Sequence, residues 1–261
     1  MNKEIKRTAD STAIFDDRTL EQDYATLSPI LKDGLQVLDV GCGTGAISKD
    51  IAAKVGATGS VTGIDNTEAF IISGRQSYGS VANLTLLHAD LFQFEPGHMF
   101  DLVVAARVLQ WLNNPKMALV KMIGWLKPGG QLSILDYNHA ALEWWPQPPK
   151  SMQLFYQTFL QWRAEAGMNN RMVKDLPTLF AEAGLHAIDV IEANEVYTRG
   201  AANFKSKLGI WSKVAASTQM VEEGYLKEED RLQAIAEYNT WIDQEAEQMI
   251  MKLKEVRGRK V

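Results

Sequence analysis

The sequence predicts an α/β fold built on a parallel sheet with helices on both of its faces. Two observations support this prediction: five short apolar runs recur between residues 36 and 136, and longer amphipathic segments separate them. Runs that are almost continuously apolar are typical of strands buried on both faces. Strands that alternate with helices form right-handed crossover units, and such units build parallel sheets.

Each element of this core is placed by an apolar run or by residues that start and end helices. The expected strands are residues 36–40, 60–64, 84–88, 100–105 and 131–136. The expected helices are residues 46–55, 67–78 and 115–126. Pro115 lies near the start of the third helix and Gly129 follows its end, and both residue types favour these positions.

The pattern changes after residue 136. Residues 144–149 are expected outside regular structure, because three prolines fall within four residues. Ser151 is expected to cap a helix that Gly167 ends. Further elements are expected from their periodicity at residues 177–183 (helix), 187–191 (strand), 204–216 and 226–248 (helices), and 249–260 (a last edge strand, with a helix as the alternative).

Composition and charge exclude several classes of protein. The 261-residue chain is 46% hydrophobic and contains seven Trp and nine Phe, which is too much apolar surface for a disordered chain. Its net charge of −5 disfavours nucleic-acid binding, which needs a basic surface. The single cysteine, Cys42, excludes a disulfide framework, and no metal site is expected. No signal peptide or membrane-spanning stretch is visible, so we expect a cytoplasmic location without membrane contact.

The segment most informative about function is the glycine-rich run from Leu38 to Ala46, between the first expected strand and the first helix. Gly41, Gly43 and Gly45 permit a tight turn and a close approach of a ligand to the backbone. The helix that follows offers unpaired N–H groups and its positive dipole end. In an open α/β sheet, ligands bind at the carboxyl ends of the strands.

Two classes of ligand fit this run. The loop matches the dinucleotide pattern G-x-G-x-x-G/A when Ala46 is taken as its last residue. Asp65, at the end of the second strand, suits the ribose of a nicotinamide dinucleotide or of another nucleoside. The additional Gly45 and the acidic Asp39 before the turn favour a ligand with a cationic amino group over a pyrophosphate.

Residues 36–136 resemble the class I S-adenosylmethionine-dependent methyltransferases in five motifs that occur in the family's order. They are the loop at 38–45, Gly63-Ile64-Asp65-Asn66, His88-Ala89-Asp90-Leu91, the strand at 100–105 with residues 107–112 after it, and the turn at 126–130. The resemblance implies a Rossmann-like fold whose seven-stranded, mostly parallel sheet has one antiparallel strand near an edge. It also implies S-adenosyl-L-methionine as the cofactor and S-adenosyl-L-homocysteine as the product, and it leaves the substrate open.

The resemblance assigns roles to several residues. Asp65 would bind the cofactor ribose, Asp90 the adenine amino group, and Leu91 would lie beside the adenine ring. The candidate cofactor-binding residues are Asp39, Gly41, Cys42, Gly43, Gly45, Asp65, Asn66, Asp90, Leu91, Arg107 and Tyr24.

Each of these assignments has a structural alternative. Asp65 and Asp90 are also suited to cap helices, as acids at such positions often do. Cys42 would then be a small packed residue and Arg107 a solvated loop residue. The N-terminal residues 13–24 are expected to fold over the cofactor, with Tyr24 and Arg18 as contacts.

An aromatic segment after the fifth strand is the candidate acceptor site. Residues 143–162 carry six aromatic side chains, and the family often places a substrate lid here. Trp144, Trp145 and Tyr156 lie off the stripe that a helix would bury, so we expect them to line a pocket for an apolar or aromatic small molecule. The alternative is that the whole segment is core. His139 is a candidate general base, and a polar loop histidine is the alternative.

The sequence thus predicts one domain over residues 1–261. Its parts are an N-terminal helical cap (1–33), a cofactor-binding core (34–136), a helical lid insertion (137–184) and C-terminal strands and helices (185–261). The predicted function is in-line transfer of a methyl group to a small-molecule acceptor. The alternatives are a nicotinamide-dependent oxidoreductase, which leaves Asp39 and Asp90 unexplained, and a non-catalytic cofactor-binding protein of the same fold.

Overall fold

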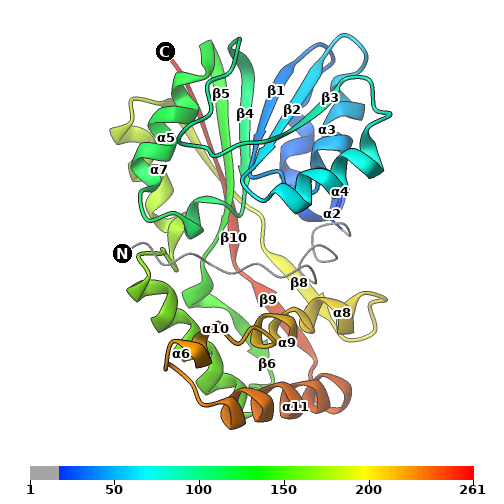
Figure 1. Cartoon of the computed structure of the whole chain (residues 1–261), viewed down its shortest axis with the longest axis vertical. Helices are drawn as coiled ribbons and strands as arrows, with labels where there is room; N and C mark the ends of the chain where they lie inside the picture. The colour runs from blue at the N-terminus through cyan, green and yellow to red at the C-terminus, as the bar shows by residue number, and fades with distance from the viewer. Residues whose placement is uncertain (1–17) are drawn as a thin grey trace. The chain divides into compact units, whose positions relative to one another are not determined.

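The computed structural model describes residues 18–261, which form two compact units (Figure 1). The first, which we call the sheet unit, comprises residues 18–136, Met172–Ala193 and Lys254–Val261. The second, the helical unit, comprises Tyr137–Arg171 and Asn194–Leu253. The expected lid at 137–184 is therefore divided between the two units. That the chain behaves as a single domain stays a prediction.

The sheet unit contains a seven-stranded sheet in the order β3-β2-β1-β4-β5-β10-β7. Its strands are β1 (Gln36–Val40), β2 (Ser60–Asp65), β3 (Leu84–His88), β4 (Phe100–Ala106), β5 (Leu126–Tyr137), β7 (His186–Glu192) and β10 (Leu253–Arg259). The first five pair in parallel, and β10 is antiparallel to β7. Backbone hydrogen bonds join Gly129 and Gly130 of β5 to Lys260, just after β10 ends, so β5 and β10 also run in opposite directions. The mostly parallel sheet predicted from the resemblance is confirmed.

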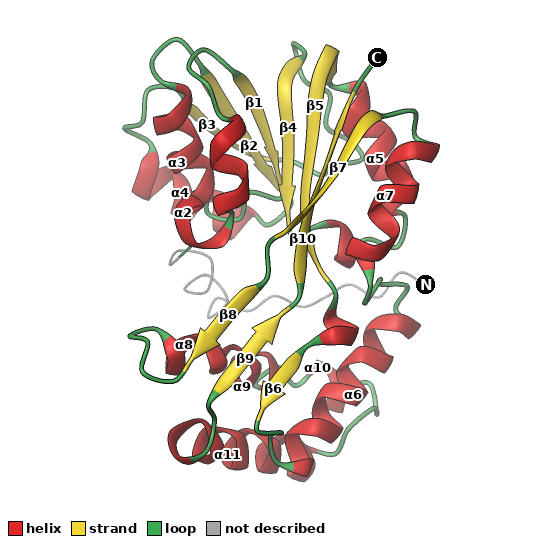
Figure 2. Cartoon of the chain, turned by 180° about the vertical axis from the view of Figure 1, so that it is seen from behind, coloured by secondary structure: helices red, strands yellow, loops and turns green. Residues whose placement is uncertain are grey.

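Helices lie on both faces of this sheet (Figure 2). One side carries α2 (Leu20–Asp23), the 3₁₀ helix η2 (Ala25–Ile30), α3 (Ala46–Val55) and α4 (Glu68–Tyr78), and the other carries α5 (Pro115–Gly124) and α7 (Met172–Glu182). Leu38 and Val40 of β1 belong to the same apolar cluster as residues of α5 and α7. Because side chains alternate along a strand, Asp39 faces the opposite side, where it contacts Ser48 of α3.

The core elements have nearly the bounds that the sequence predicts. Strands β1 and β3 and helix α3 match to the residue, and β2, β4 and α4 differ by one residue at one end. Strand β5 begins five residues early, because the expected turn at 126–130 is the irregular start of the strand. The register against β4 shifts between Phe100 and Leu102 at this point.

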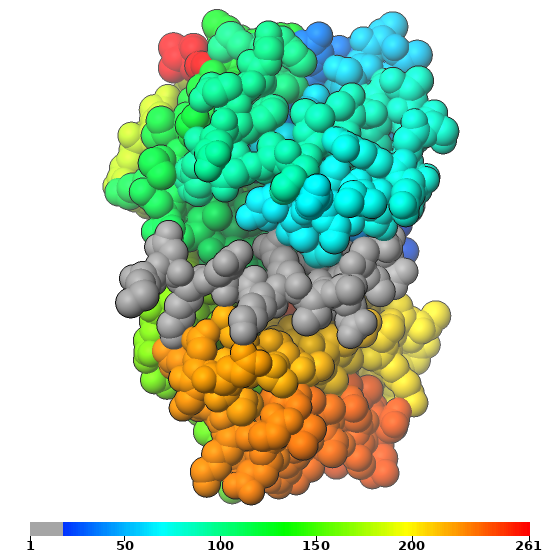
Figure 3. Space-filling view, viewed as in Figure 1, coloured from blue at the N-terminus to red at the C-terminus, as the bar shows by residue number. Residues whose placement is uncertain are grey.

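The helical unit combines helices with a three-stranded antiparallel sheet in the order β6-β9-β8. Its elements are the 3₁₀ helix η4 (His139–Ala141), β6 (Glu143–Trp145), α6 (Lys150–Glu165), β8 (Glu195–Thr198), α8 (Phe204–Leu208), α9 (Ile210–Ala215), α10 (Gln219–Glu222), α11 (Glu228–Gln244) and β9 (Gln248–Met251). Helices α6 and α11 pack against each other. On the face seen in Figure 3, α10 and α11, in orange, form much of the surface of this unit.

Two predictions for the helical unit are wrong. Trp144 and Trp145 lie in strand β6, which pairs with β9. Pro146 comes after the strand, so its missing N–H does not interrupt this pairing. Ser151 does not cap α6, because the helix already begins at Lys150 after Pro149. The Ser151 hydroxyl instead donates to Glu237 of α11, at 2.5 Å.

The C-terminal third also departs from the prediction. The helix expected at 204–216 is divided into α8 and α9 at Gly209. The expected edge strand at 249–260 is two strands, and the second, β10, lies inside the large sheet with β7 at the edge. Its residues 255–257 are all buried, which a strand at an edge would not require.

Candidate functional site

The glycine-rich loop joins β1 to α3 at the carboxyl ends of the parallel strands. Gly41 has a φ of 71°, and a Cβ there would lie 2.4 Å from a methyl group of Val108 in the loop after β4. Gly45, at the N-terminus of α3, has a φ of 84°. The N–H groups of Gly41 and Cys42 donate to the carbonyl of Ile64 at the end of β2 (2.7 and 3.0 Å). Glycine is therefore required at 41 and 45, and the loop is held against its two neighbouring strands.

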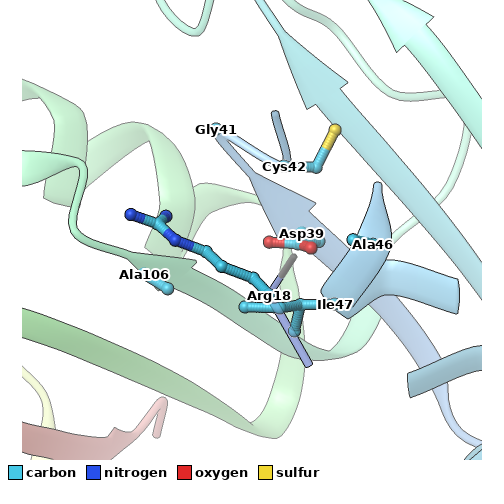
Figure 4. A pocket seen from close by; sticks show the side chains of 7 residues that line it. All are labelled: Arg18, Asp39, Gly41, Cys42, Ala46, Ile47 and Ala106. Atoms are coloured by element: carbon cyan, nitrogen blue, oxygen red, sulfur yellow. The ribbon is translucent and has the colours of Figure 1, made fainter. Parts of the chain in front are cut away.

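A pocket opens beside this loop, where the strand order reverses between β1 and β4 (Figure 4). It is lined by Arg18, Asp39, Gly41, Cys42, Ala46, Ile47 and Ala106. This is the switch point at which open α/β sheets bind their ligands. The lining places one cation and one anion among small and apolar residues. Such a pocket suits a ligand group that carries both an ammonium and a carboxylate.

Asp39 is the buried acid of this pocket, with 5% of its surface exposed. The hydroxyl of Ser48 donates to its Oδ2 at 2.6 Å. Burial raises the pKa of Asp39 to about 6; the hydrogen bond from Ser48 opposes this shift, and the negative charge of Asp65 adds to it. The carboxylate is thus an uncompensated charge in a partly closed site, and a cationic group of a ligand would stabilise it.

Asp65 lies at the end of β2 with both carboxylate oxygens bonded to backbone. The N–H of Gly43 donates to Oδ2 (3.0 Å) and the N–H of Thr67 donates to Oδ1 (2.8 Å). Asp65 therefore connects the glycine-rich loop to the start of α4. The next residue, Asn66, is exposed. Each oxygen of Asp65 retains a second acceptor position, so this structural role does not prevent a bond to a ribose hydroxyl.

Asp90 follows β3 and is exposed. Its Oδ1 accepts the N–H groups of Phe92 (2.8 Å) and Gln93 (3.2 Å), which closes a turn. Leu91 is partly buried beside it. The capping alternative thus describes Oδ1 of Asp90, whereas the turn does not use Oδ2.

Arg107 and Tyr24 are buried outside the pocket lining. Arg107, just after β4, has a φ of 63°, and its guanidinium donates to the carbonyl of Asp23 at 2.9 Å. The hydroxyl of Tyr24 lies 2.6 Å from that of Ser133 on β5. Both side chains therefore attach the α2 segment to the sheet. Of the N-terminal residues expected over the cofactor, residues 13–17 lie outside the described part of the chain, and Arg18 lines the pocket.

His139 lies in an aromatic cluster of the helical unit. Its ring centroid is 4.9 Å from that of Tyr137 and 6.0 Å from that of Trp211. Burial lowers the pKa of His139 well below its ordinary value, and the charge of Arg163 adds to the shift. The imidazole is thus neutral at physiological pH and packed among rings, unlike a polar loop histidine.

The three expected acceptor residues have different surroundings in the helical unit. Trp144 is 7% exposed, and its indole N–H donates to the hydroxyl of Tyr238 at 3.0 Å. Tyr156 is equally buried, and its hydroxyl donates to the carbonyl of His139 at 2.7 Å. Trp145 is 70% exposed. The expectation that all three lie off a buried stripe is wrong for Trp144 and Tyr156, because Trp211 of α9 packs against both rings and Tyr238 of α11 contacts Trp144.

Sequence reasoning did not identify Ser48 or Ser133. Ser48 lies in the first turn of the helix after the loop, and this position could have indicated a hydrogen-bond donor near Asp39. Ser133 is in an apolar strand, and nothing local indicates its partners.

Within residues 18–261 no group of three or more His, Cys, Asp or Glu is placed to hold a metal ion, and no helix there is long and apolar enough to cross a membrane.

Comparison with known proteins gives consistent matches. A family model described as a methyltransferase domain matches residues 31–184. Demethylmenaquinone methyltransferase of Staphylococcus aureus (strain JH9) is 30% identical over 184 residues, which cover 64% of this chain and 76% of that protein.

Solved structures share the fold at lower identity. A S-adenosylmethionine-dependent methyltransferase from Aquifex aeolicus aligns with a TM-score of 0.57 and 18% identity, covering 98% of this chain and 100% of that one. Phosphoethanolamine N-methyltransferase 2 of Haemonchus contortus, in complex with S-adenosyl-L-methionine, aligns with a TM-score of 0.59 and 16% identity over 92% of this chain. The alignment covers 52% of that protein, so this chain corresponds to about half of its length.

Proposed function

Because this chain belongs to the class I S-adenosylmethionine-dependent methyltransferases, we propose that it methylates an apolar or aromatic small molecule and binds the methyl donor at the pocket beside the glycine-rich loop. The observation that supports this site most directly is the presence of both an acid, Asp39, and a base, Arg18, in the pocket lining. The methionine end of the donor carries an ammonium and a carboxylate. Asp39 would bind the ammonium and Arg18 the carboxylate, each by a charge-assisted hydrogen bond.

The nucleoside would extend from this pocket across the ends of β2 and β3. Gly41, Cys42, Gly43 and Gly45 offer a backbone without bulk for its close approach. Asp65 ends β2 and Asn66 follows it, and these two residues would bind the ribose hydroxyls. Beyond them, Oδ2 of Asp90 would accept the adenine amino group, with Leu91 beside the ring. Arg107 and Tyr24 would act indirectly, by holding the α2 segment from which Arg18 extends.

The proposed methyl transfer needs little general acid–base catalysis. When bound, the donor supplies a methyl group on a positively charged sulfur, which an acceptor atom attacks in line so that S-adenosyl-L-homocysteine leaves. The residues of this chain would hold the donor rigidly and keep water away, which is where most of the rate enhancement of such a transfer can arise. The neutral imidazole of His139 is compatible with accepting a proton, but its packing among rings supports no assigned step.

An apolar acceptor is supported by the helical unit and by one relative. The unit contains a dense cluster of buried aromatic side chains, and Trp145 is exposed on its surface. The Staphylococcus aureus relative is named for demethylmenaquinone, an apolar quinone. We assign Trp145 to direct contact with the acceptor, whereas Trp144 and Tyr156 would support that surface from within.

Two measurements test this proposal. Calorimetry should show binding of S-adenosyl-L-methionine and S-adenosyl-L-homocysteine and no binding of NAD. Methyl transfer from a labelled donor should then favour apolar quinols and phenols over polar amines such as phosphoethanolamine. Binding of NAD without either sulfur nucleoside would overturn the donor site, and preference for the polar amine would overturn the acceptor class alone.

A further inference from the structure

Ser48, on the first turn of α3, contacts Asp39 of the methyl-donor pocket. Its side chain is fully buried, and its hydroxyl donates to Oδ2 of Asp39 at 2.6 Å. The backbone of the loop holds this turn in place, because the N–H of Lys49 donates to the carbonyl of Gly45 and that of Gly45 to the carbonyl of Cys42. The Ser48 hydroxyl is therefore fixed in position before any ligand enters.

The hydrogen bond decides how Asp39 faces the pocket. A carboxylate on the short Asp side chain rotates about one terminal bond, and a buried donor on Oδ2 selects one orientation. Asp39 also lines the pocket, together with Arg18 (Figure 4). Oδ1 is consequently the oxygen left to receive a ligand.

We propose that Ser48 is a positioning residue for the methyl donor, whose hydroxyl holds the Asp39 carboxylate as an anion directed at the ligand's ammonium group. The inference rests on the proposed function, since it takes the ammonium to be that of the methionine end. It adds a residue that neither the family motifs nor the pocket lining include.

The charges around Asp39 make this hydrogen bond consequential. From β2, Asp65 opposes ionisation of Asp39, and burial opposes it more strongly. From the N-terminal side, Arg18 lines the same pocket, and the charge of Asp39 acts on the phenol of Tyr24 and the thiol of Cys42. Ser48 is the one donor on α3 that favours the anion, so its removal would raise the pKa of Asp39.

A comparison of two ligands isolates this role. S-Adenosyl-L-homocysteine has the amino-acid end, and 5′-methylthioadenosine has the same nucleoside without it. In Ser48→Ala, affinity for S-adenosyl-L-homocysteine should fall about tenfold, and affinity for 5′-methylthioadenosine should stay within about twofold. Ser48→Thr keeps the hydroxyl and should restore binding, and Ser77→Ala, an exposed serine on α4, should change neither affinity.

The pH profile gives a second readout that a purely structural role would not move. Affinity for S-adenosyl-L-homocysteine should decline as the pH falls and Asp39 takes up a proton, and in Ser48→Ala this decline should begin at a higher pH. Adding Ser48→Ala to Asp39→Asn should cause no further loss, because the hydroxyl acts through the carboxylate.

The possible failures are distinguishable. If wild type binds neither sulfur nucleoside, the proposed function itself is wrong. If wild type binds both ligands and Ser48→Ala weakens them equally, or weakens neither, the donor site stands and the positioning role is overturned. An unchanged pH profile in Ser48→Ala would overturn it as well.

Discussion

Glu255 and Arg257, two residues apart on β10, form a bidentate ion pair inside the sheet unit. Nε of Arg257 lies 2.7 Å from one carboxylate oxygen and Nη2 lies 2.9 Å from the other. Ser133 donates to Glu255 and receives the hydroxyl of Tyr24, and Arg257 also donates to the carbonyl of Thr26. A continuous set of hydrogen bonds therefore joins the C-terminal strand to the segment that brings Arg18 to the pocket.

This arrangement predicts a large stability cost for Glu255→Ala. Removing one partner of a buried ion pair leaves the other charge uncompensated, which costs about 3–5 kcal/mol. Urea denaturation should show the loss as a lower midpoint. Glu182→Ala removes one partner of the exposed pair with Lys116 and is the matched control, with an expected change below about 1 kcal/mol. Equal effects of the two substitutions would mean that the β10 pair is not desolvated.

The adjacent tryptophans of β6 provide a second test. Trp144 is buried and hydrogen-bonded to Tyr238, so Trp144→Ala should lower the free energy of unfolding by about 3–5 kcal/mol. Trp145 is exposed, so Trp145→Ala should change it by about 0.5 kcal/mol or less. Under the proposed function, Trp145→Ala should raise the KM for the acceptor and leave affinity for the donor unchanged. Thermal denaturation and steady-state kinetics separate the two effects.

Asp39→Asn should stabilise the free protein and weaken donor binding. The folded-state pKa of Asp39 is about 6, above the ordinary 3.8, so the native state holds more protons than the unfolded state between these values. Stability from this group is thus full below about pH 4 and is lost as the pH rises through about 6. At pH 7 the neutral Asn should raise the free energy of unfolding by on the order of 1–3 kcal/mol.

The gain should vanish below about pH 3, where Asp39 is protonated in both states. Affinity for S-adenosyl-L-homocysteine at pH 7 should fall roughly tenfold or more, because a charge-assisted bond is lost. Urea denaturation at the two pH values and calorimetry check the prediction. Asp189→Asn, at an exposed position on β7, is the control. A destabilised Asp39→Asn at pH 7 would contradict it.

Asp65→Ala should reduce both stability and ligand affinity. The carboxylate accepts the N–H groups of Gly43 and Thr67, and their loss leaves both donors without this partner, at a cost of about 1–3 kcal/mol. Affinity for S-adenosyl-L-homocysteine should fall at least about tenfold through the ribose contact. Calorimetry well below the melting temperature keeps the two effects apart. Unchanged affinity in the folded variant would remove Asp65 from the site.

Asp90→Asn tests the adenine position. The Asn oxygen can still accept from Phe92 and Gln93, so the turn should survive. The variant should lose affinity for S-adenosyl-L-homocysteine and lose little for S-inosyl-L-homocysteine, which lacks the amino group. Equal losses, measured by calorimetry on the two ligands, would show that Asp90 serves the turn alone.

The sequence by itself determined the strands and helices of the sheet core and the glycine-rich loop. These features are local, because neighbouring residues alone identify a nearly continuous apolar run, a helix that begins at Pro115, and the glycines at 41 and 45. The acids Asp39, Asp65 and Asp90 were found for the same reason, since each lies near the end of a strand whose position the apolar run itself marks.

Only the tertiary structure decided which side chains are buried and what they contact. Trp144 is buried because Tyr238, 94 residues later, receives its indole N–H, and Glu255 is tolerated inside the sheet because Ser133 and Arg257 satisfy its oxygens. The orientation of Asp39 depends likewise on a serine one element away. Such contacts depend on how distant elements pack, and no spacing along the chain records them.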